Sequence, residues 1–301
     1  AIVGINITEV KTLKYRDHLW DDPFFRRFFG RNFGVRKKQY EVRGLGSGFL
    51  ISSDGYILTN HHVAGRASEI LVTLTDGRKF EAEIIGSDRV SDVALLKIEG
   101  DDFPFLKFSD SDDIIIGEWV IALGNPFGLF SINAKPTVTV GVVSNKDINL
   151  FNDGRVYKGM IQTDAAISSG NSGGPLVNAL GEVIAMNTII FSTAQDSKGA
   201  GSIGIGFAIP INRVKTIVEK LKIDGKINRN FDIGIEVKEI NERIAQYLDS
   251  DVETGVVIFS IRRRSIAEKS GFEPGDIILS INGNKIKSVD DYLLSIYDSE
   301  A

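Results

Sequence analysis

Ser172 lies in the glycine-rich run Gly-Asn-Ser-Gly-Gly-Pro, a setting typical of an activated nucleophile. A nucleophilic serine needs an imidazole to accept its hydroxyl proton. The chain has three histidines, His18, His61 and His62, and all of them precede Ser172. An α/β-hydrolase places its histidine after its serine, so that arrangement is excluded. The order that remains is histidine, then acid, then serine.

The candidate acid is Asp92, which directly precedes the apolar run 93–98. Histidine, aspartate, serine is the order of chymotrypsin-like double barrels, in which two barrels meet at the catalytic cleft. The histidine would take the serine proton and return it to the leaving amine, while Asp92 orients the imidazole. His61 and His62 both remain candidates, because neighbouring side chains on an extended segment point to opposite faces.

The loop around the serine supplies a second element of this chemistry. Backbone N–H groups of Gly170, Asn171 and Ser172 would form an oxyanion hole for the charge that develops on the scissile carbonyl. Glycine in this run permits the tight turn that such donors require.

The elements that must position these residues read as short strands. From residue 45 to about residue 209, β-branched segments alternate with turn signals such as Ser53-Asp54-Gly55. This pattern predicts a mostly β fold, and we expect a double-barrel protease domain over residues 1–210. Two polar, glycine-containing segments, 144–159 and 192–201, are expected to be loops able to switch between ordered and disordered states.

The pattern changes after Pro210. Apolar residues at helical spacing predict a linker helix over residues 211–228, and a small α+β domain follows over residues 229–301. Its expected elements are the strand 233–240, the helix 242–248, the strand 255–261, the helix 266–270, a hairpin at 281–283 and the helix 289–297.

Residues 11–43 form an insertion with five phenylalanines between positions 24 and 33, flanked by arginines. Asp21-Asp22-Pro23 is a good helix start. One interpretation is a short helix buried on its own domain, and the other is an exposed loop that docks on another subunit.

The amino-acid composition argues against several classes of function. The 301 residues include no cysteine, and the formal net charge is −5. We therefore expect no thiol chemistry, no zinc or other metal site, and no nucleic-acid partner. No apolar run is long enough for a membrane span, and no signal peptide is visible. Gly199, Gly201 and Gly204 match a dinucleotide fingerprint, but a predicted strand follows them, so no cofactor is expected.

Three motifs resemble the bacterial HtrA (Deg) serine proteases. They are Thr-Asn-His-His-Val at 59–63, Ser-Asp-Val-Ala-Leu at 91–95, and Gln-Thr-Asp-Ala-Ala-Ile at 162–167 leading into the run around Ser172. The resemblance continues through Gly-Ile-Gly-Phe-Ala-Ile-Pro at 204–210 and into the C-terminal unit. In that family the histidine before the valine is catalytic, which implies a triad of His62, Asp92 and Ser172, with His61 as a bystander.

The resemblance also implies an activity and a setting. The expected function is an ATP-independent endopeptidase that degrades unfolded or misfolded proteins outside the cytoplasm, in the periplasm or cell envelope. Chaperone activity and assembly into a homotrimer, or a higher assembly of trimers, are expected with it. The implied S1 pocket contains Ile167, Ala166 and Phe191 and has no acid at its base, so cleavage should follow aliphatic residues such as valine or alanine.

The C-terminal unit resembles a PDZ domain of the HtrA type. The segment Ile233-Gly234-Ile235 would capture the terminal carboxylate of a peptide, and the strand after it would accept the peptide by β-augmentation. The family's domain continues beyond the position of Ala301, so we expect this one to be truncated. An alternative function is a chaperone or peptide-binding scaffold whose protease is latent until peptide or stress switches the triad on.

Overall fold

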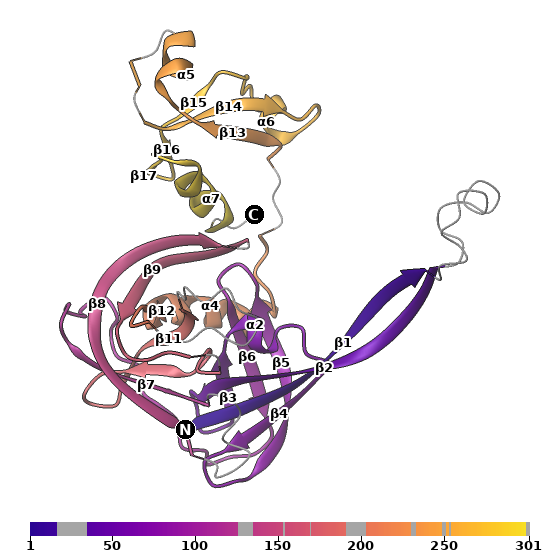
Figure 1. The fold of residues 1–301 in the computed structure, drawn as a ribbon, viewed down its shortest axis with the longest axis vertical. Coiled ribbons are helices and arrows are strands. Elements are labelled where there is room, and N and C mark those ends of the chain that lie inside the picture. Colours follow the sequence, from indigo (N-terminus) through magenta and orange to yellow (C-terminus); the bar gives the residue numbers. More distant parts are fainter. Residues whose placement is uncertain are drawn as a thin grey trace.

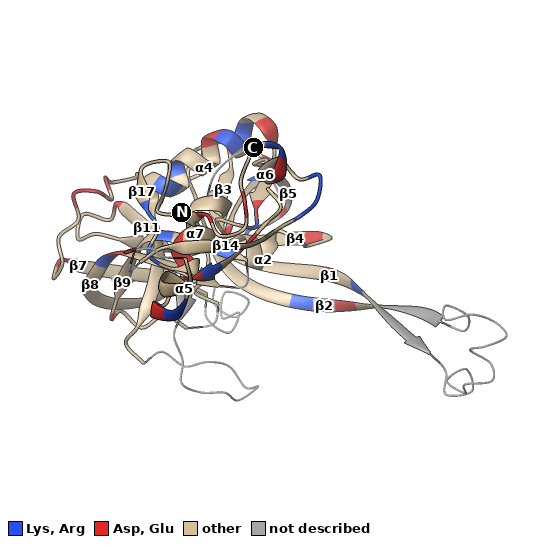
Figure 2. Cartoon of the chain, turned by 90° about the horizontal axis from the view of Figure 1, so that it is seen from above, with Lys and Arg blue, Asp and Glu red and all other residues tan. Residues whose placement is uncertain are grey.

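The structure is a computed structural model that describes residues 1–16, 35–125, 135–152, 154–168, 170–190, 203–229, 233–248, 251–252 and 254–298. Two closed β-barrels pack together with one helix, and a small α+β unit follows (Figure 1). The mostly β class and the double barrel agree with the prediction. Acidic and basic residues alternate along the visible elements rather than gathering in one stretch (Figure 2).

The first barrel contains the strands that precede and follow the candidate histidine. Its strands close in the order β1-β2-β3-β6-β5-β4, and each pairs antiparallel with its neighbours. Their bounds are β1 Ile2–Arg16, β2 Val35–Leu50, β3 Tyr56–Thr59, β4 Glu69–Leu74, β5 Lys79–Asp88 and β6 Val93–Ile98. Alternate apolar side chains of these strands fill the barrel, as the period of two requires.

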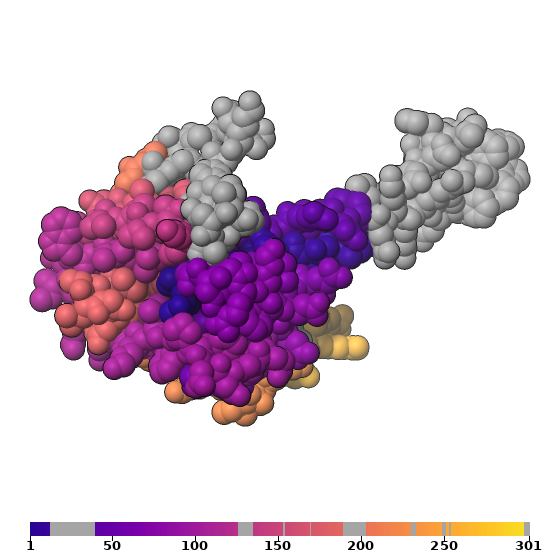
Figure 3. Space-filling view, turned by 90° about the horizontal axis from the view of Figure 1, so that it is seen from below, coloured from indigo at the N-terminus to yellow at the C-terminus, as the bar shows by residue number. Residues whose placement is uncertain are grey.

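A long hairpin projects from this barrel. Strands β1 and β2 stay paired from Ile2 opposite Phe49 to Arg16 opposite Val35, and the paired arm extends away from the body (Figures 1 and 3). The ends of the predicted insertion, residues 11–16 and 35–43, are therefore strand. The phenylalanine cluster lies outside the described residues, so both interpretations of it stay open.

The second barrel carries the candidate nucleophile loop. Its strands close in the order β10-β11-β12-β9-β8-β7. Their bounds are β7 Trp119–Gly124, β8 Thr137–Asn152, β9 Arg155–Thr163, β10 Pro175–Val177, β11 Val183–Ile190 and β12 Gly206–Pro210.

The prediction that residues 144–159 form a loop is wrong. Residues 144–152 lie in β8 and residues 155–159 lie in β9, where pairs such as Ile148 with Met160 and Leu150 with Tyr157 hold the strands together. Residues 192–201 lie outside the described part.

Helix α4, Ile211–Asp224, covers both barrels (Figure 1). Its buried stripe joins one apolar cluster with Leu58 and Leu95 of the first barrel and Met186 of the second. The helix occupies most of the predicted linker 211–228 and ends at Asp224, because Gly225 adopts a left-handed conformation, φ 68°, and its N–H caps the carbonyl of Leu221.

The C-terminal unit follows the predicted element order. Its bounds are β13 Ile235–Glu239, α5 Glu242–Tyr247, β14 Val256–Ile261, α6 Ile266–Lys269, β15 Ile277–Ile278, β16 Ser280–Ile281, β17 Asn284–Lys285 and α7 Val289–Asp298. Helix α7 touches the second barrel, where the rings of Phe151 and Tyr297 lie 5.6 Å apart. Arg229 forms a buried ion pair with Asp88 at 3.0 Å and also donates to the carbonyl of Tyr297.

Candidate active site

The two adjacent histidines lie in a short helix, α2, His61–Ala64, rather than on an extended strand as the sequence suggested. The carbonyl of Asn60 accepts hydrogen bonds from the N–H groups of Val63 and Ala64, and this turns the chain immediately after β3. Successive helical residues still point in different directions. The His61 ring lies 3.2 Å from the Ser87 hydroxyl, whereas the His62 ring turns to Asp92.

The carboxylate of Asp92 meets the imidazole of His62 directly. His62 Nδ1 lies 2.8 Å from Oδ2 of Asp92, and the backbone N–H of His62 donates to Oδ1 at 3.0 Å. Asp92 itself adopts a left-handed conformation, φ 59°, which is tolerated by aspartate and marks a constrained position. Its carbonyl is held by the side-chain amide of Asn60 and the N–H of His61. The ring and the acid are thus fixed by both side-chain and backbone bonds.

Asp92 is fully buried, so its charge must be compensated by donors. The hydroxyls of Thr188 and Tyr157 donate to Oδ2 at 2.8 and 3.2 Å, and Nε of Arg155 lies 3.7 Å from Oδ1. Burial by itself raises the pKa of Asp92, but the hydrogen bonds from His62, followed by that from Thr188, hold this pKa below its usual value. The acid therefore remains ionised beside the imidazole.

The loop that presents Ser172 is a tight turn. Gly170 has φ 99° and Gly173 has φ 83°, both in the left-handed half of conformational space. A Cβ at Gly173 would also collide with the carbonyl of Ser47, so only glycine fits there. The N–H of Asn171 donates to the carbonyl of Ser168 at 3.0 Å and is not available to a substrate. Within the described chain, the N–H groups of Gly170 and Ser172 make no hydrogen bond, which leaves two donors for an oxyanion.

The Ser172 hydroxyl donates to the carbonyl of Thr188 at 3.0 Å. In the described part of the chain, no hydrogen bond joins this hydroxyl to His62. The Thr188 side chain donates to Asp92, so one residue of β11 contacts both the predicted nucleophile and the predicted acid. Catalytic hydrogen bonds are often absent in unliganded enzymes and form when substrate binds.

Ser47 of the first barrel anchors the nucleophile loop of the second. Its hydroxyl donates to the carbonyl of Gly170 and accepts from the N–H of Asn125, while its own N–H donates to the carbonyl of Ser172 at 3.0 Å. Thr59 donates to the Ser47 carbonyl at 2.7 Å. The serine loop is thereby held against β2, which pairs with β3, the strand that leads to the histidines.

Two of the three predicted S1 residues fall in the described chain. Ile167 is buried in the apolar core of the second barrel and packs over Gly206. Ala166 is exposed, and its carbonyl accepts a hydrogen bond from Thr139 at 2.8 Å. Phe191 lies outside the described residues.

Of the three predicted peptide-binding residues, Ile233 and Gly234 directly precede β13, and Ile235 is its first residue. Gly234 has φ 79°, and Ser265 packs where its side chain would be. The carbonyls of Ile233 and Gly234 accept from the N–H groups of Ala267 and Arg262, and Ile235 pairs with Ile261. Among the described strands, β13 pairs with β14 alone and so forms one edge of its sheet.

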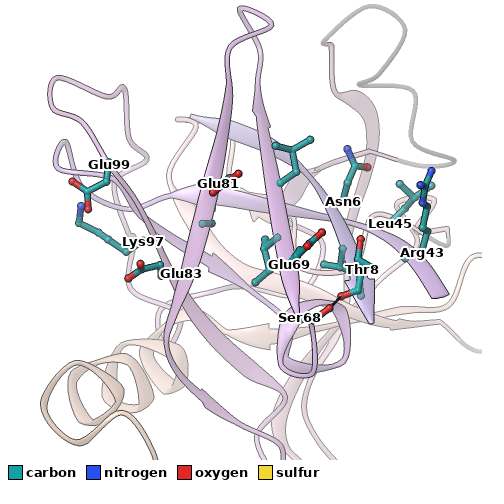
Figure 4. Close-up of a pocket in the computed structure, with 15 residues that line it drawn as sticks. Asn6, Thr8, Arg43, Leu45, Ser68, Glu69, Glu81, Glu83, Lys97 and Glu99 are labelled. Carbon is teal, nitrogen blue, oxygen red and sulfur yellow. Dashed lines mark hydrogen bonds between the residues drawn. The ribbon is translucent and has the colours of Figure 1, made fainter. Parts of the chain in front are cut away.

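A hollow of about 890 Å³ lies on the first barrel, away from this chemistry. Strands β1, β2, β4, β5 and β6 line it, and Lys97 lies near Glu83 and Glu99 on one side (Figure 4). Its lining includes no member of the predicted triad. The described residues contain no group of three or more histidine, cysteine or acidic side chains arranged for a metal, and no described helix is long and apolar enough to cross a membrane.

Sequence reasoning missed four residues of the site: Ser47, Arg155, Tyr157 and Thr188. Thr188 has a recognisable signal, since Asn187-Thr188 is a polar pair inside the apolar strand β11. Ser47 sits between two glycines, which indicates a close backbone approach. Tyr157 and Arg155 have no comparable signal.

Comparison with known proteins agrees with this geometry. Residues 46–186 match the trypsin-like peptidase domain, and residues 257–296 match the PDZ domain. A protein of Pseudomonas putida named "probable periplasmic serine endoprotease DegP-like" is 43% identical over 270 residues, which are 88% of this chain and 54% of that protein. A Chlamydia trachomatis protein of the same name is 42% identical over 272 residues, 90% of this chain and 52% of its own length. The chain thus spans about half the length of these curated relatives.

Solved structures extend the likeness to the whole fold. The HtrA-type protease AlgW with a decapeptide has a TM-score of 0.74 and 36% identity, covering 98% of this chain and 87% of its own. The serine endoprotease of Yersinia pestis has a TM-score of 0.66 and 31% identity, covering 100% and 85%. The chain belongs to the HtrA family of serine proteases, with a trypsin-like peptidase domain followed by a PDZ domain.

Proposed function

We propose that this protein is a serine endopeptidase that degrades unfolded or misfolded proteins without ATP. The observation that carries the proposal is the 2.8 Å contact between His62 and buried Asp92, next to a serine loop with two unused N–H donors. The chain also contains no Walker-type phosphate-binding motif.

The chemistry assigns one role to each group. His62 removes the hydroxyl proton as Ser172 Oγ bonds to the peptide carbonyl carbon, and the N–H groups of Gly170 and Ser172 stabilise the oxyanion. His62 then gives the proton to the departing amine, which leaves an acyl-enzyme. Water activated by His62 hydrolyses that ester and restores the serine. Asp92 keeps Nδ1 of the ring protonated and stabilises the imidazolium throughout.

A fluorophosphonate probe together with a casein digest tests this function. The wild-type protein should be labelled and should degrade unfolded casein, while Ser172→Ala should lose both activities. Ser53→Ala, at an exposed serine outside the site, is the control and should behave as the wild type. Labelling that persists in Ser172→Ala would refute the assignment of the nucleophile.

We also propose cleavage after small or medium aliphatic residues. Ile167 offers an apolar wall, and no acidic side chain is predicted at the pocket base beside Ala166. A peptide library digested by the protein should give mainly valine and alanine at the residue before the cut. A product set dominated by lysine or arginine would contradict this preference.

The PDZ unit is proposed to bind peptide C-termini along the edge of β13. Val289, Leu293 and Ile296 form a partly buried stripe at helical spacing on α7, the helix that touches this strand. The loop Ile233-Gly234-Ile235 would receive the carboxylate. A labelled peptide with a free apolar C-terminus should bind in an anisotropy assay, and its C-terminal amide should bind more weakly.

Assembly into a homotrimer is proposed through the outer face of β7 and β8. Trp119, Val138 and Val140 on these strands are each more than half exposed, as are Ile115 and Ile116 just before β7, and Trp119 is 64% exposed. An apolar patch of this kind is typical of a surface that another subunit covers. Light scattering should give a trimer mass for the wild type and a smaller mass for Trp119→Asp. An unchanged mass would exclude this patch as the interface.

Action outside the cytoplasm is proposed from the relatives, which are named as periplasmic proteins. Fractionation of cells that make the full-length protein should place it in the periplasmic or envelope fraction.

A second candidate function is a chaperone whose protease is latent. The observation that favours it is the Ser172 hydroxyl, which faces the Thr188 carbonyl instead of His62. In that case the fluorophosphonate should label slowly until a C-terminal peptide is added. Ser172→Ala should also suppress aggregation of an unfolded protein as well as the wild type does.

A further inference from the structure

The start of strand β9 contacts the turn that carries the catalytic acid. Tyr157 is 2% exposed, and its hydroxyl donates to Oδ2 of Asp92 at 3.2 Å. One residue earlier, the N–H of Val156 donates to the carbonyl of Val90 at 2.7 Å. Nε of Arg155 lies 3.7 Å from Oδ1 of the same carboxylate. Three consecutive residues of the second barrel therefore hold the acid turn of the first.

We propose that Tyr157 is a positioning residue for the proposed proteolysis. Its hydroxyl fixes the Asp92 carboxylate from the opposite barrel and limits how strongly that carboxylate binds the His62 ring. The proposal rests on the proposed function, because it assigns Tyr157 a role through Asp92 and His62.

The geometry around Oδ2 supports this role. This one oxygen accepts from His62 Nδ1, from Thr188 and from Tyr157. An oxygen that accepts several hydrogen bonds shares its negative charge among the donors, so each donor weakens the hydrogen bonds from the others. The phenol is a rigid donor, because its ring is packed in the apolar cluster with Leu58 and Leu95 of the first barrel.

The phenol of Tyr157 also stays protonated at every pH at which cleavage is measured. Burial, followed by the charge of Asp92, raises the pKa of Tyr157 above its ordinary value. Tyr157 therefore remains a donor to Asp92 over the whole pH range used for the cleavage assays. Tyr157→Phe removes this donor and keeps the ring that fills the cluster.

Removing the hydroxyl changes two measurable properties. The carboxylate loses one restraint, so kcat should fall about tenfold, while KM should stay constant because Tyr157 does not face the substrate. More of the Asp92 charge becomes available to His62, which stabilises the imidazolium. The acid limb of the kcat/KM profile should therefore move upward by about half a pH unit. The other charged groups near the pair, Arg155, His61 and Asp88, are unchanged in this variant.

Tyr56→Phe is the matched control. Tyr56 is a partly buried tyrosine of β3 that packs against the same cluster, and its ring lies beside the ammonium groups of Lys97 and Lys222 rather than the acid. Both variants would be compared with the wild type by peptide cleavage between pH 5 and 9 and by thermal unfolding. Tyr56→Phe should keep the wild-type kcat and pH profile.

A second readout does not depend on turnover. In Ser172→Ala protein, the proton of the His62–Asp92 hydrogen bond should give a low-field NMR signal. Addition of Tyr157→Phe should move this signal further downfield, since the acid then binds the ring more strongly. Tyr56→Phe should leave it in place.

The outcomes separate this inference from the proposed function. Tyr157→Phe with an unshifted acid limb and an unshifted proton signal overturns the positioning role, even if the protein melts at a lower temperature. Cleavage that survives Ser172→Ala overturns the triad itself. Loss of cleavage in Ser172→Ala together with the shifted profile of Tyr157→Phe supports both.

Discussion

The hydroxyl of Ser172 donates to the backbone carbonyl of Thr188 at 3.0 Å, while the hydroxyl of Thr188 donates to Asp92 at 2.8 Å. Thr188 thus contacts both ends of the predicted triad through different atoms. In the proposed mechanism, the Ser172 hydroxyl has to leave this carbonyl before His62 can accept its proton. The threonine side chain, in contrast, is already placed as the acid requires.

Replacement of Thr188 by valine should therefore remove one hydrogen bond to Asp92. It should keep the hydrogen bond from the Ser172 hydroxyl to the backbone carbonyl at this position. Valine keeps the backbone carbonyl and the side-chain shape but leaves buried Asp92 without one donor, so kcat should fall about tenfold or more. Thr188→Ser restores a hydroxyl and should recover most of the rate. Steady-state kinetics on a peptide substrate measure kcat for both variants. Equal rates for valine and threonine at this position would contradict a role in holding the acid.

Asp92→Asn tests the acid itself. An amide at this position favours the wrong tautomer of His62, and in serine proteases such a change lowers kcat on the order of 10⁴-fold. Binding of a peptide substrate should change little, because Asp92 is buried behind the histidine. Single-turnover acylation is the appropriate measurement, and a loss of less than about tenfold would be incompatible with the assignment.

The same variant gives a prediction for stability. Since the pKa of Asp92 in the folded protein is lowered, its ionised form stabilises the fold above the unfolded pKa of about 3.9. That stabilisation is lost as the pH falls below this value and through the lower folded pKa. Urea unfolding should show a difference between wild type and Asp92→Asn that is larger at pH 6 than near pH 3. A difference that grows on acidification would reverse the sign and refute the lowered pKa.

His61 should make stability depend on pH in a higher range. Burial lowers its pKa, and the positive charges of Arg66 and Arg155 add to this while Asp92 opposes it. A histidine with a lowered folded pKa stabilises the protein fully above its unfolded pKa of about 6.5, and this contribution is lost as the pH falls through that value. The melting temperature of the wild type should therefore fall between pH 7.5 and 5.5.

His61→Asn should reduce that fall, because asparagine does not titrate. Its kcat at pH 8 should match the wild type, since His61 faces Ser87 and not the acid. Differential scanning fluorimetry at the two pH values measures the effect. If the melting temperatures of wild type and His61→Asn fall equally between the two pH values, a group other than His61 causes the pH dependence.

Ser47→Ala tests the contact between the barrels. The buried hydroxyl connects the carbonyl of Gly170 with the N–H of Asn125, so its removal should cost about 1–3 kcal/mol of unfolding free energy. The nucleophile loop should also become more mobile, which lowers kcat. Ser53→Ala removes an exposed hydroxyl and is the matched control. Similar unfolding midpoints for the two variants would mean that the Ser47 bridge contributes nothing.

Much of the fold is predictable because its signals are local. The linker helix, the order of the C-terminal elements and the glycine turns follow from spacing within short windows. The loop predicted at 144–159 is an instructive error. Its apolar residues Ile148, Leu150 and Tyr157 are separated by polar ones, a pattern that fits a loop as well as a strand. Only the pairing of β8 with β9 makes the segment a strand.

The site divides in the same way. His62, Asp92 and Ser172 each lie in a short motif, so their roles could be predicted from the sequence, and these roles stay predictions until the variants are measured. Tyr157 lies 65 residues from Asp92, and only the register of β9 brings its hydroxyl to the acid. The extended conformation inferred for the two histidines was wrong because the carbonyl of Asn60 starts a helical turn there.

The division of the acid's donors between two barrels has a consequence for the newly made chain. His62 and Asp92 belong to the first barrel, whereas Ser172, Thr188 and Tyr157 belong to the second. A folding intermediate that contains only the first barrel has neither a nucleophile nor the hydroxyls that hold its acid. Proteolytic competence therefore appears only when both barrels have closed against each other. In the proposed mechanism, a copy whose second barrel is still unfolded therefore cannot cleave other chains or itself.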